Sequence, residues 1–265
     1  MEQPDGGGTP LSTNTFSSMG TVVSLSFPAA VDPLLQDAAL AAADEVFHAL
    51  DERFSLYRPA SELSRLNEGT LRLAEASPQL RAAYQQAADW RLRTDGAFTP
   101  DRPDGALDLS GIVKALAMQD AGNAVRSLGL ADWCLNAGGD VLCAGRPAEG
   151  SDWTVGIVDP ADRSALVTVA PLDPAAGRAA VATSGTAERG EHIWAAGAGA
   201  GARTFAQVSV VAADIVTADV LATAVIAGGQ AMLDKAVGGW DVEIFAVDRS
   251  GQLLATPLFR APAAG

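Results

Sequence analysis

Hydrophobic residues recur along the chain at two spacings, and each spacing predicts one kind of element. Ala42, Val46 and Leu50 follow one another at four-residue intervals, with charged residues between them. This spacing places them on one face of a helix, so we expect a long helix from residue 32 to about residue 54 that buries these side chains. Apolar and polar residues instead alternate towards the end of Thr15–Phe27, which predicts a strand.

Two further helices are predicted from their first residues. Ser61 precedes a short helical segment, and Ser77-Pro78 combines a capping serine with a proline at the first helical position. The second of these helices is expected to end before Gly96. Its predicted buried residues are Leu80, Tyr84, Ala87 and Trp90.

The stretch from residue 107 to residue 145 combines short apolar runs with glycines. Leu107–Leu109 predicts a strand, and a helix is expected to begin near Ile112 and to end at Gly129. Trp133–Leu135 is the next predicted strand. It leads into Gly138-Gly139, where two adjacent glycines allow the backbone either to turn sharply between strands or to approach a ligand closely.

The second half of the chain alternates short apolar runs with turns rich in proline and glycine. The predicted elements are strands over Trp153–Val158, Ala165–Ala170, Ala179–Thr183 and Thr204–Ala212, a helix capped by Thr217, a short helix over Gln230–Val237, and a closing hairpin of Asp241–Val247 with Gln252–Phe259. No internal repeat or linker interrupts this order. We therefore predict a single α+β domain over residues 14–265, with a mixed or antiparallel sheet and packed helices, after a disordered leader over residues 1–13.

The net charge of −14 argues against nucleic acid and anionic membranes as partners, because both require a basic surface. No apolar run approaches the roughly 18 residues of a membrane span, and the first residues lack the pattern of a signal peptide. We therefore expect a cytoplasmic protein without a membrane span. Cys134 and Cys143 flank the glycine pair; we expect buried free thiols, the alternative being a pair that faces across a hairpin.

Two groups of polar residues indicate chemistry. Asp108 and Lys114 surround a predicted helix start, where a carboxylate, a lysine and exposed amides suit a phosphorylated ligand and its metal. Asp219 and Thr223 are four residues apart on one helix face and offer the hard oxygen ligands that Mg²⁺ prefers. The alternative for this second pair is an acid favoured by the helix dipole and a threonine in the core.

Two histidines occur in the chain. His48 lies within the first long helix, where we expect it on a partly buried surface. His192 lies in a glycine-rich loop beside charged residues; it is either a general base, for which a pKa near about 6.5 is suited, or a solvated loop residue. Ser184 lacks the Gly-x-Ser-x-Gly elbow of a serine nucleophile, and the chain has neither a dinucleotide-binding glycine motif nor a P-loop.

Eight short blocks follow one another in an order that is more informative than any single block. They are SMGTVVSL, FSLYRPASELSRLNEG, DGAFTP, LDLSGIVKALAMQDA, LNAGGDVLCAG, WTVGIVDP, VATSGTAERGEHIW and TADVLATAVIAGG. In this order they resemble the ApbE family, the FAD:protein FMN transferases. The resemblance extends over residues 14–247.

The resemblance implies a Mg²⁺-dependent enzyme that cleaves the pyrophosphate of FAD, transfers FMN to a Thr or Ser hydroxyl of an acceptor flavoprotein and releases AMP. It implies His192 as the base for the acceptor hydroxyl and Lys114 as a second catalytic residue. The metal ligands that it implies are Asp219, Thr223 and the backbone carbonyl of Gly111. The nucleotide contacts that it implies are Met19, Tyr57, Ala97, Phe98 and Asp108. We add Gly138, Gly139, Thr183 and Ser184, because glycine-rich turns supply backbone amides to phosphates.

The sequence departs from the family pattern beside the expected active site. Thr99-Pro100 replaces Asp-Pro, and only Asp101–Leu107 remains of a longer segment. Ala115-Leu116 follows Lys114 in place of Gly-Tyr or Gly-Trp, and Ala195-Ala196 stands where Asp-Pro is usual. Two alternatives therefore stay open: an FAD pyrophosphatase in which water replaces the acceptor hydroxyl, and a flavin-nucleotide-binding protein with reduced or no catalysis.

Overall fold

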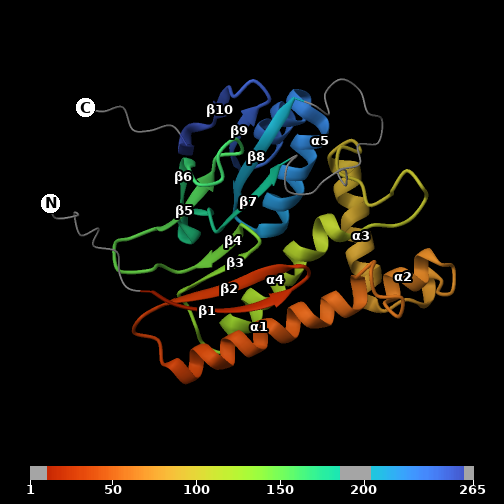
Figure 1. Cartoon of the computed structure of the whole chain (residues 1–265), viewed down its shortest axis with the longest axis horizontal. Helices are drawn as coiled ribbons and strands as arrows, with labels where there is room; N and C mark the ends of the chain where they lie inside the picture. Colours follow the sequence, from red (N-terminus) through yellow and green to blue (C-terminus); the bar gives the residue numbers. More distant parts are fainter. Residues whose placement is uncertain (1–10, 186–203, 260–265) are drawn as a thin grey trace.

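A long antiparallel sheet, with helices packed along one of its faces, organises the computed structural model, which describes residues 11–185 and 204–259 (Figure 1). The strands are β1 (Leu11–Ser18), β2 (Thr21–Pro28), β3 (Trp133–Ala137), β4 (Asp140–Ala144), β5 (Trp153–Val158), β6 (Leu166–Leu172), β7 (Ala180–Gly185), β8 (Phe205–Ala212), β9 (Glu243–Asp248) and β10 (Leu253–Ala255). The α-helices are α1 (Pro33–Phe54), α2 (Glu62–Asn67), α3 (Pro78–Arg93), α4 (Ser110–Ser127) and α5 (Ile215–Gly239), and short 3₁₀ turns lie at Leu73–Glu75, Pro174–Ala176 and Pro257–Phe259.

Within these described residues the strand order in the main sheet is β1-β2-β3-β4-β7-β8-β9-β10, and all neighbouring pairs are antiparallel. The hairpin of β5 and β6 forms a second, two-stranded sheet. The α+β fold class with an antiparallel sheet and packed helices is therefore confirmed.

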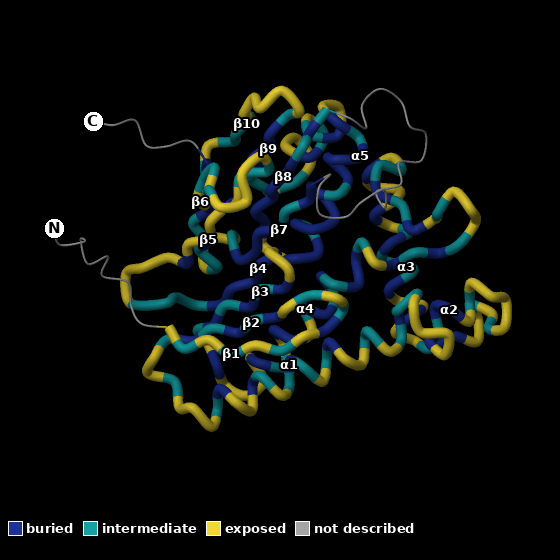
Figure 2. Tube along the Cα trace, viewed as in Figure 1, coloured by how far each residue is buried: buried dark blue, intermediate teal, exposed yellow. Residues whose placement is uncertain are grey.

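Both faces of the central strands are covered, and the alternation of side chains along a strand explains how. In β4, Leu142 faces the helices, whereas Val141 and Cys143 belong to a second core under the β5–β6 hairpin. Val181 of β7 joins this second core, and its neighbour Ala180 joins the first. Every residue of β4 is therefore buried, and Figure 2 shows the buried trace running through the middle of the sheet.

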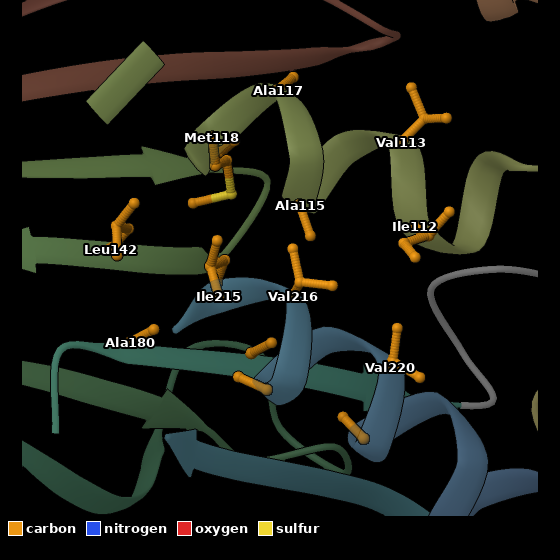
Figure 3. Close-up of a cluster of buried hydrophobic side chains, with 14 of the residues drawn as sticks. Ile112, Val113, Ala115, Ala117, Met118, Leu142, Ala180, Ile215, Val216 and Val220 are labelled. Atoms are coloured by element: carbon orange, nitrogen blue, oxygen red, sulfur yellow. The ribbon is translucent and has the colours of Figure 1, made fainter. Parts of the chain in front are cut away.

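The first core lies mainly between α4, α5 and the sheet. Figure 3 shows that Ile112, Ala115 and Met118 on α4 lie across from Val216 and Val220 on α5. The packing of α4 against α5 thereby fixes the position of polar residues that the same two helices carry.

The helix starts follow the predicted capping chemistry in most places. The side chains of Ser61 and Ser77 accept hydrogen bonds from amides at the starts of α2 and α3. The predicted cap of α5 is wrong, because Asp214 is the capping residue and Thr217 donates its amide to the Asp214 carboxylate at 2.8 Å.

Several expected boundaries and burial patterns differ from the structure. The strand predicted over Thr15–Phe27 is two strands, because Met19 (φ 50°) and Gly20 (φ 71°) adopt the left-handed conformation of a tight turn. β1 begins at Leu11, so residues 11–13 belong to the sheet and not to a leader. The strand predicted over Leu107–Leu109 is only a bridge between Asp101 and Leu107, ahead of a helix that already begins at Ser110.

The buried stripe of α1 also differs. It consists of Gln36, Ala39, Ala43, Phe47 and Phe54, and the predicted Ala42, Val46 and Leu50 are half-buried. The reason is that β1 and α4 both cover α1, as the edge-on contact between Phe47 and Phe16 of β1 shows. In α3 the same shift makes Ala83 buried and Tyr84 half-buried.

α5 combines the helix predicted after Thr217 with the short helix predicted over Gln230–Val237. Gly229 (φ 63°, ψ −148°) interrupts the helical backbone where the two segments join. By length and composition α5 resembles a membrane span, with a mean hydropathy of 1.5, but 72% of that apolar window is buried inside the fold. Its hydrophobicity is therefore that of a central core helix.

Gly122 of α4 provides a test of this packing. A Cβ at Gly122 would lie 2.7 Å from Cη2 of the buried Trp133 and 3.2 Å from Cδ2 of Leu142. We expect Gly122→Ala to lower the free energy of unfolding by about 1 kcal/mol or more, because overpacking outweighs the roughly 1 kcal/mol gain in helix propensity. Gly238→Ala in α5, where no atom lies within 4 Å of the added Cβ, is the matched control and should be neutral or stabilising. Equal free energies of unfolding of the two variants in urea would contradict the close packing of Gly122 against Trp133 and Leu142.

Candidate functional site

A lysine and two aspartates meet where α4, β4 and α5 approach one another. The Lys114 ammonium forms an ion pair with Oδ2 of Asp140, and Asp140 interacts electrostatically with Asp219. The Lys114 side chain is 19% exposed, the Asp140 side chain 2%, and Asp219 is fully buried. We call Lys114, Asp140 and Asp219 the charged cluster.

The strand order explains how Asp140 is held. It is the first residue of β4, directly after the Gly138-Gly139 turn, and its Oδ1 accepts a hydrogen bond from the Thr183 amide of β7 at 3.0 Å. The ladder between β4 and β7 contains only Val141↔Val181 and Leu142↔Ala180. The Asp140 carboxylate therefore continues the connection between the two strands where their backbones no longer pair.

The electrostatics of the cluster are dominated by burial. Removal from water raises the pKa of Asp140, the negative charge of Asp219 raises it further, and the Lys114 ammonium opposes both effects. The net direction is upwards, because desolvation is the largest of these effects. The site thus concentrates negative charge beside a single cation.

Hydroxyl groups extend the charged cluster. Oγ of the buried Ser184 lies 3.1 Å from Oγ1 of Thr223, one turn along α5 from Asp219. Thr183 precedes Ser184 in β7 and contributes only its amide, because its hydroxyl, 2.8 Å from Oγ of Ser209, lies on the opposite face of the sheet with Val181. Ends of β7 and α5 therefore place carboxylate and hydroxyl oxygens in one region.

The donors at this site are hard oxygens, the ligand type that Mg²⁺, Ca²⁺ and Mn²⁺ prefer. Asp219 and Thr223 supply hard oxygens, with Ser184 as the neighbouring hydroxyl, and Mg²⁺ is commonly held by one or two carboxylates plus phosphate and water. Within residues 11–185 and 204–259 no group of three or more His, Cys, Asp or Glu residues has the arrangement of a metal site. Asp219 is buried in the second turn of α5, and Thr223 is half-buried.

Asp108 lies at the start of α4, close in sequence to Lys114. Its Oδ1 accepts a hydrogen bond from the Ser110 amide at 2.8 Å, and its own amide donates to the Pro100 carbonyl at 2.8 Å. Asp108 therefore fixes the first turn of α4, the segment that carries Lys114.

Phe98 and Gly111 contact each other in the connection between α3 and α4. A Cβ on Gly111 would lie 3.2 Å from Cε2 of Phe98, whose side chain is buried in the core. Ala97 lies against α5 in the same way, because a Cβ on Gly228 would lie 3.2 Å from its Cβ. The Ala97-Phe98 segment thus packs between the start of α4 and the middle of α5.

A separate open pocket of about 690 Å³ lies at the β1–β2 turn. Its lining residues are Ser17, Ser18, Met19, Gly20, Thr21, Val22, His48, Asp51 and Arg58. Gly138 packs against Thr21, one of these lining residues, because a Cβ on Gly138 would lie 2.8 Å from Oγ1 of Thr21. Gly139 donates its amide to the Asn136 side chain at 3.0 Å, within the β3–β4 turn.

The structure thus brings the predicted site residues together in three groups. The first group is the charged cluster, which contains the predicted Lys114 and Asp219 and has the Ser184 and Thr223 hydroxyls and the Thr183 amide beside it. The second group, at the start of α4, consists of Ala97, Phe98, Asp108 and Gly111. The third group is Met19 in the β1–β2 pocket, with the adjacent turn of Gly138 and Gly139. Tyr57 lies outside these groups, with 91% of its surface exposed. His192 lies outside the described residues.

Three residues of these groups were missed or misjudged from sequence. Asp140 is the central one, and the sequence feature that could have indicated it is an acidic residue at the start of the otherwise apolar strand DVLCA. His48, expected on a partly buried surface, is exposed and lines the β1–β2 pocket. Arg58 lines the same pocket and forms a 2.8 Å ion pair with Asp51.

Comparisons with known proteins agree on one relationship. The model of the ApbE family matches residues 19–102 and 99–241. The ApbE protein of Thermotoga maritima is 20% identical with a TM-score of 0.78, covering 95% of this chain and 100% of that one. The flavin transferase ApbE of Vibrio cholerae is 19% identical with a TM-score of 0.73, covering 94% of this chain and 99% of that one. The apo flavinyl transferase ApbE of Pseudomonas stutzeri is 18% identical with a TM-score of 0.74, covering 96% of this chain and 99% of that one. Curated proteins give no significant match.

The raised pKa of Asp140 predicts a pH dependence of stability. The folded state binds the Asp140 proton more tightly than the unfolded chain does, so this group makes the free energy of unfolding fall as pH rises from its ordinary value of 3.8 through the raised pKa. We expect Asp140→Asn to remove this contribution, which makes the slope of stability against pH less negative than in wild type. Urea unfolding across the acid-to-neutral range measures the slopes. Identical slopes would show that burial does not shift the pKa of the Asp140 carboxyl group. Asp37→Asn, at an exposed position of α1, is the control.

Proposed function

This chain belongs to the ApbE family, and we propose that it transfers FMN from FAD to a Thr or Ser hydroxyl of an acceptor flavoprotein, releasing AMP. The observation that carries the proposal is the charged cluster of Lys114, Asp140 and Asp219 beside the Ser184 and Thr223 hydroxyls. An anionic pyrophosphate approaching a protein of net charge −14 needs such local help from a cation and from a metal.

The reaction exchanges one phosphorus–oxygen bond for another. The acceptor oxygen bonds to the phosphorus on the FMN side of the FAD pyrophosphate, and the bond from that phosphorus to the bridging oxygen breaks. AMP leaves with the bridging oxygen, and the hydroxyl proton passes to the base. We assign His192 as this base, on the family resemblance of its sequence block.

Asp219 and Thr223, with the Gly111 carbonyl, would hold Mg²⁺. When bound, the ion neutralises charge on the pyrophosphate and on the leaving phosphate. Lys114 orients and neutralises phosphate oxygens at the same site, and Asp140 keeps its ammonium group in place. Met19 and the Gly138-Gly139 turn would contact the flavin nucleotide at the β1–β2 pocket. At the end of β7 the Thr183 amide is bonded to Asp140, so the Ser184 hydroxyl would be the polar contact for phosphate oxygens.

The direct test is incubation of the full chain with FAD and Mg²⁺, with and without an acceptor protein that carries a flavinylation motif. The proposal predicts AMP together with covalent flavin on the acceptor, and no covalent flavin when the acceptor Thr or Ser is replaced by Ala. Release of AMP and FMN without an acceptor would establish an FAD pyrophosphatase instead. Binding of FAD without either product would establish a nucleotide-binding protein.

Asp219→Asn tests the metal assignment. The substitution preserves the size of the buried side chain but removes its charge, which a hard cation tolerates poorly. We expect Mg²⁺-dependent turnover to fall about a hundredfold or more, the equivalent of a few kcal/mol of lost transition-state stabilisation. Asp214→Asn, at the exposed cap of the same helix, should keep turnover near wild type. Unchanged turnover in Asp219→Asn would exclude Asp219 as a ligand.

His192→Ala tests the base. A positioned general base contributes about 10²–10⁴-fold to rate, so flavin transfer should fall at least a hundredfold while FAD affinity stays within a few-fold. Arg81→Ala, at an exposed position of α3 outside the three groups, is the control and should retain transfer. We also expect Ala195→Asp combined with Ala196→Pro to raise the wild-type rate. Equal transfer by wild type and His192→Ala would remove His192 as the base.

A further inference from the structure

The two cysteines of the chain face each other across the β3–β4 hairpin. Cys134 and Cys143 are register partners in the antiparallel ladder, and their Sγ atoms are 3.2 Å apart. Both are free thiols, as the sequence predicted, but only Cys143 is buried, and Cys134 is half-buried. The alternative arrangement, a pair facing across a hairpin, therefore also holds.

The position of the pair in the ladder favours a covalent link. The Cys143 amide donates to the Ala179 carbonyl at 2.7 Å, on the β7 side, so it points away from Cys134. This is the orientation of a non-hydrogen-bonded pair, in which the Cα atoms are about 4.5 Å apart. Disulfides require Cα separations of about 4.4–6.8 Å, so the sulfurs need to approach by only about 1 Å without displacing either strand.

The surroundings give the two sulfurs different roles. Cys143 lies in the core under the β5–β6 hairpin, with Trp153 and Val181, and this burial raises the pKa of its thiol well above the ordinary range. Cys134 packs against the same core but remains partly accessible to solvent. A reagent in solution therefore meets Cys134 first.

We propose that Cys134 and Cys143 form a thiol–disulfide exchange site that a small disulfide, such as oxidised glutathione, converts to a cross-strand disulfide. The Cys134 thiol loses its proton to solvent and its sulfur attacks one sulfur of the reagent, which releases the other as a thiolate. The Cys143 thiol then loses its proton, and its sulfur attacks Sγ of Cys134 and expels the second thiolate. In total, two protein thiols are oxidised and one reagent disulfide is reduced to two thiols.

The disulfide would covalently connect β3 and β4 in the hairpin next to the charged cluster. Asp140 is three residues from Cys143 on β4, and the Gly138-Gly139 turn is enclosed between the two cysteines. Oxidation therefore ties together the two strands that carry the turn and the Asp140 carboxylate. It also restricts the unfolded chain, so the midpoint of thermal unfolding should rise by about 4 °C or more.

Intact-mass measurement after thiol alkylation tests the proposal. The full native chain is equilibrated in oxidised and reduced glutathione at graded ratios, acid-quenched and alkylated under denaturing conditions. We expect the oxidised wild type to lose both alkylation sites and two hydrogens, to retain no glutathione, and to recover both sites on reduction with dithiothreitol. Because the second step requires deprotonation of buried Cys143, the disulfide should form faster as pH rises.

Two variants separate the steps. Cys143→Ala, which adds no polar group to the core, should retain one glutathione on Cys134, because the resolving thiol is absent. Cys134→Ser should stay unmodified while folded, because Cys143 is buried. The proposal is overturned if wild type retains glutathione, links into disulfide dimers, or keeps two free thiols under conditions that modify Cys143→Ala. It is equally overturned if no glutathione ever attaches to a folded Cys143→Ala, or if oxidation lowers the unfolding midpoint.

Discussion

The buried ion pair of Lys114 and Asp140 is the interaction on which the arrangement of the site depends. Taking a carboxylate and an ammonium out of water costs several kcal/mol per ion, which is recovered only when the two groups are in contact and their remaining polar atoms are satisfied. Asp140 meets this condition through Lys114 on one oxygen and the Thr183 amide on the other. A displacement of α4, β4 or β7 relative to the others would leave a charge buried without compensation, so the pair restricts all three elements at once.

Apolar packing supplies the rigidity that this restriction requires. α4 and α5 contact each other through apolar side chains such as those of Ile112 and Val216 (Figure 3). The β5–β6 hairpin covers the opposite face of the sheet, so β4 is buried on both sides (Figure 2). The charged cluster therefore sits at the edge of a dry, closely packed region, where electrostatic interactions are stronger than at a surface. Asp219 enters this region from α5 and brings a second carboxylate near Asp140.

Much of the fold was predictable from sequence, because most elements carry local signals. Capping residues such as Ser77 marked helix starts, and the β5 strand was predicted with its observed bounds. The errors arose where tertiary contacts decide. The Met19-Gly20 turn splits one alternating segment into two strands, and the stripe of α1 depends on neighbours that its sequence does not reveal.

The candidate site was predictable in part for the same reason. Asp219 and Thr223 share a helix face, which spacing alone shows, but their proximity to Lys114 and Asp140 follows from the strand order. Asp140 was missed because its role depends on a cation 26 positions earlier in the chain and on an amide of β7. A single acid before an apolar strand carries no local pattern that names such partners.

A double-mutant cycle on the ion pair tests this account most directly. The free energies of unfolding of wild type, Lys114→Met, Asp140→Asn and the double variant are measured at neutral pH. Lys114→Met should cost about 3 kcal/mol or more, because it leaves the buried Asp140 carboxylate without its cation, whereas Asp140→Asn should cost less, because Lys114 is 19% exposed and burial already disfavours the charged form of Asp140. The double variant should cost at least about 2 kcal/mol less than the sum of the two single variants. Single effects that add within about 0.5 kcal/mol would contradict the claim that this pair holds α4 and the sheet in register.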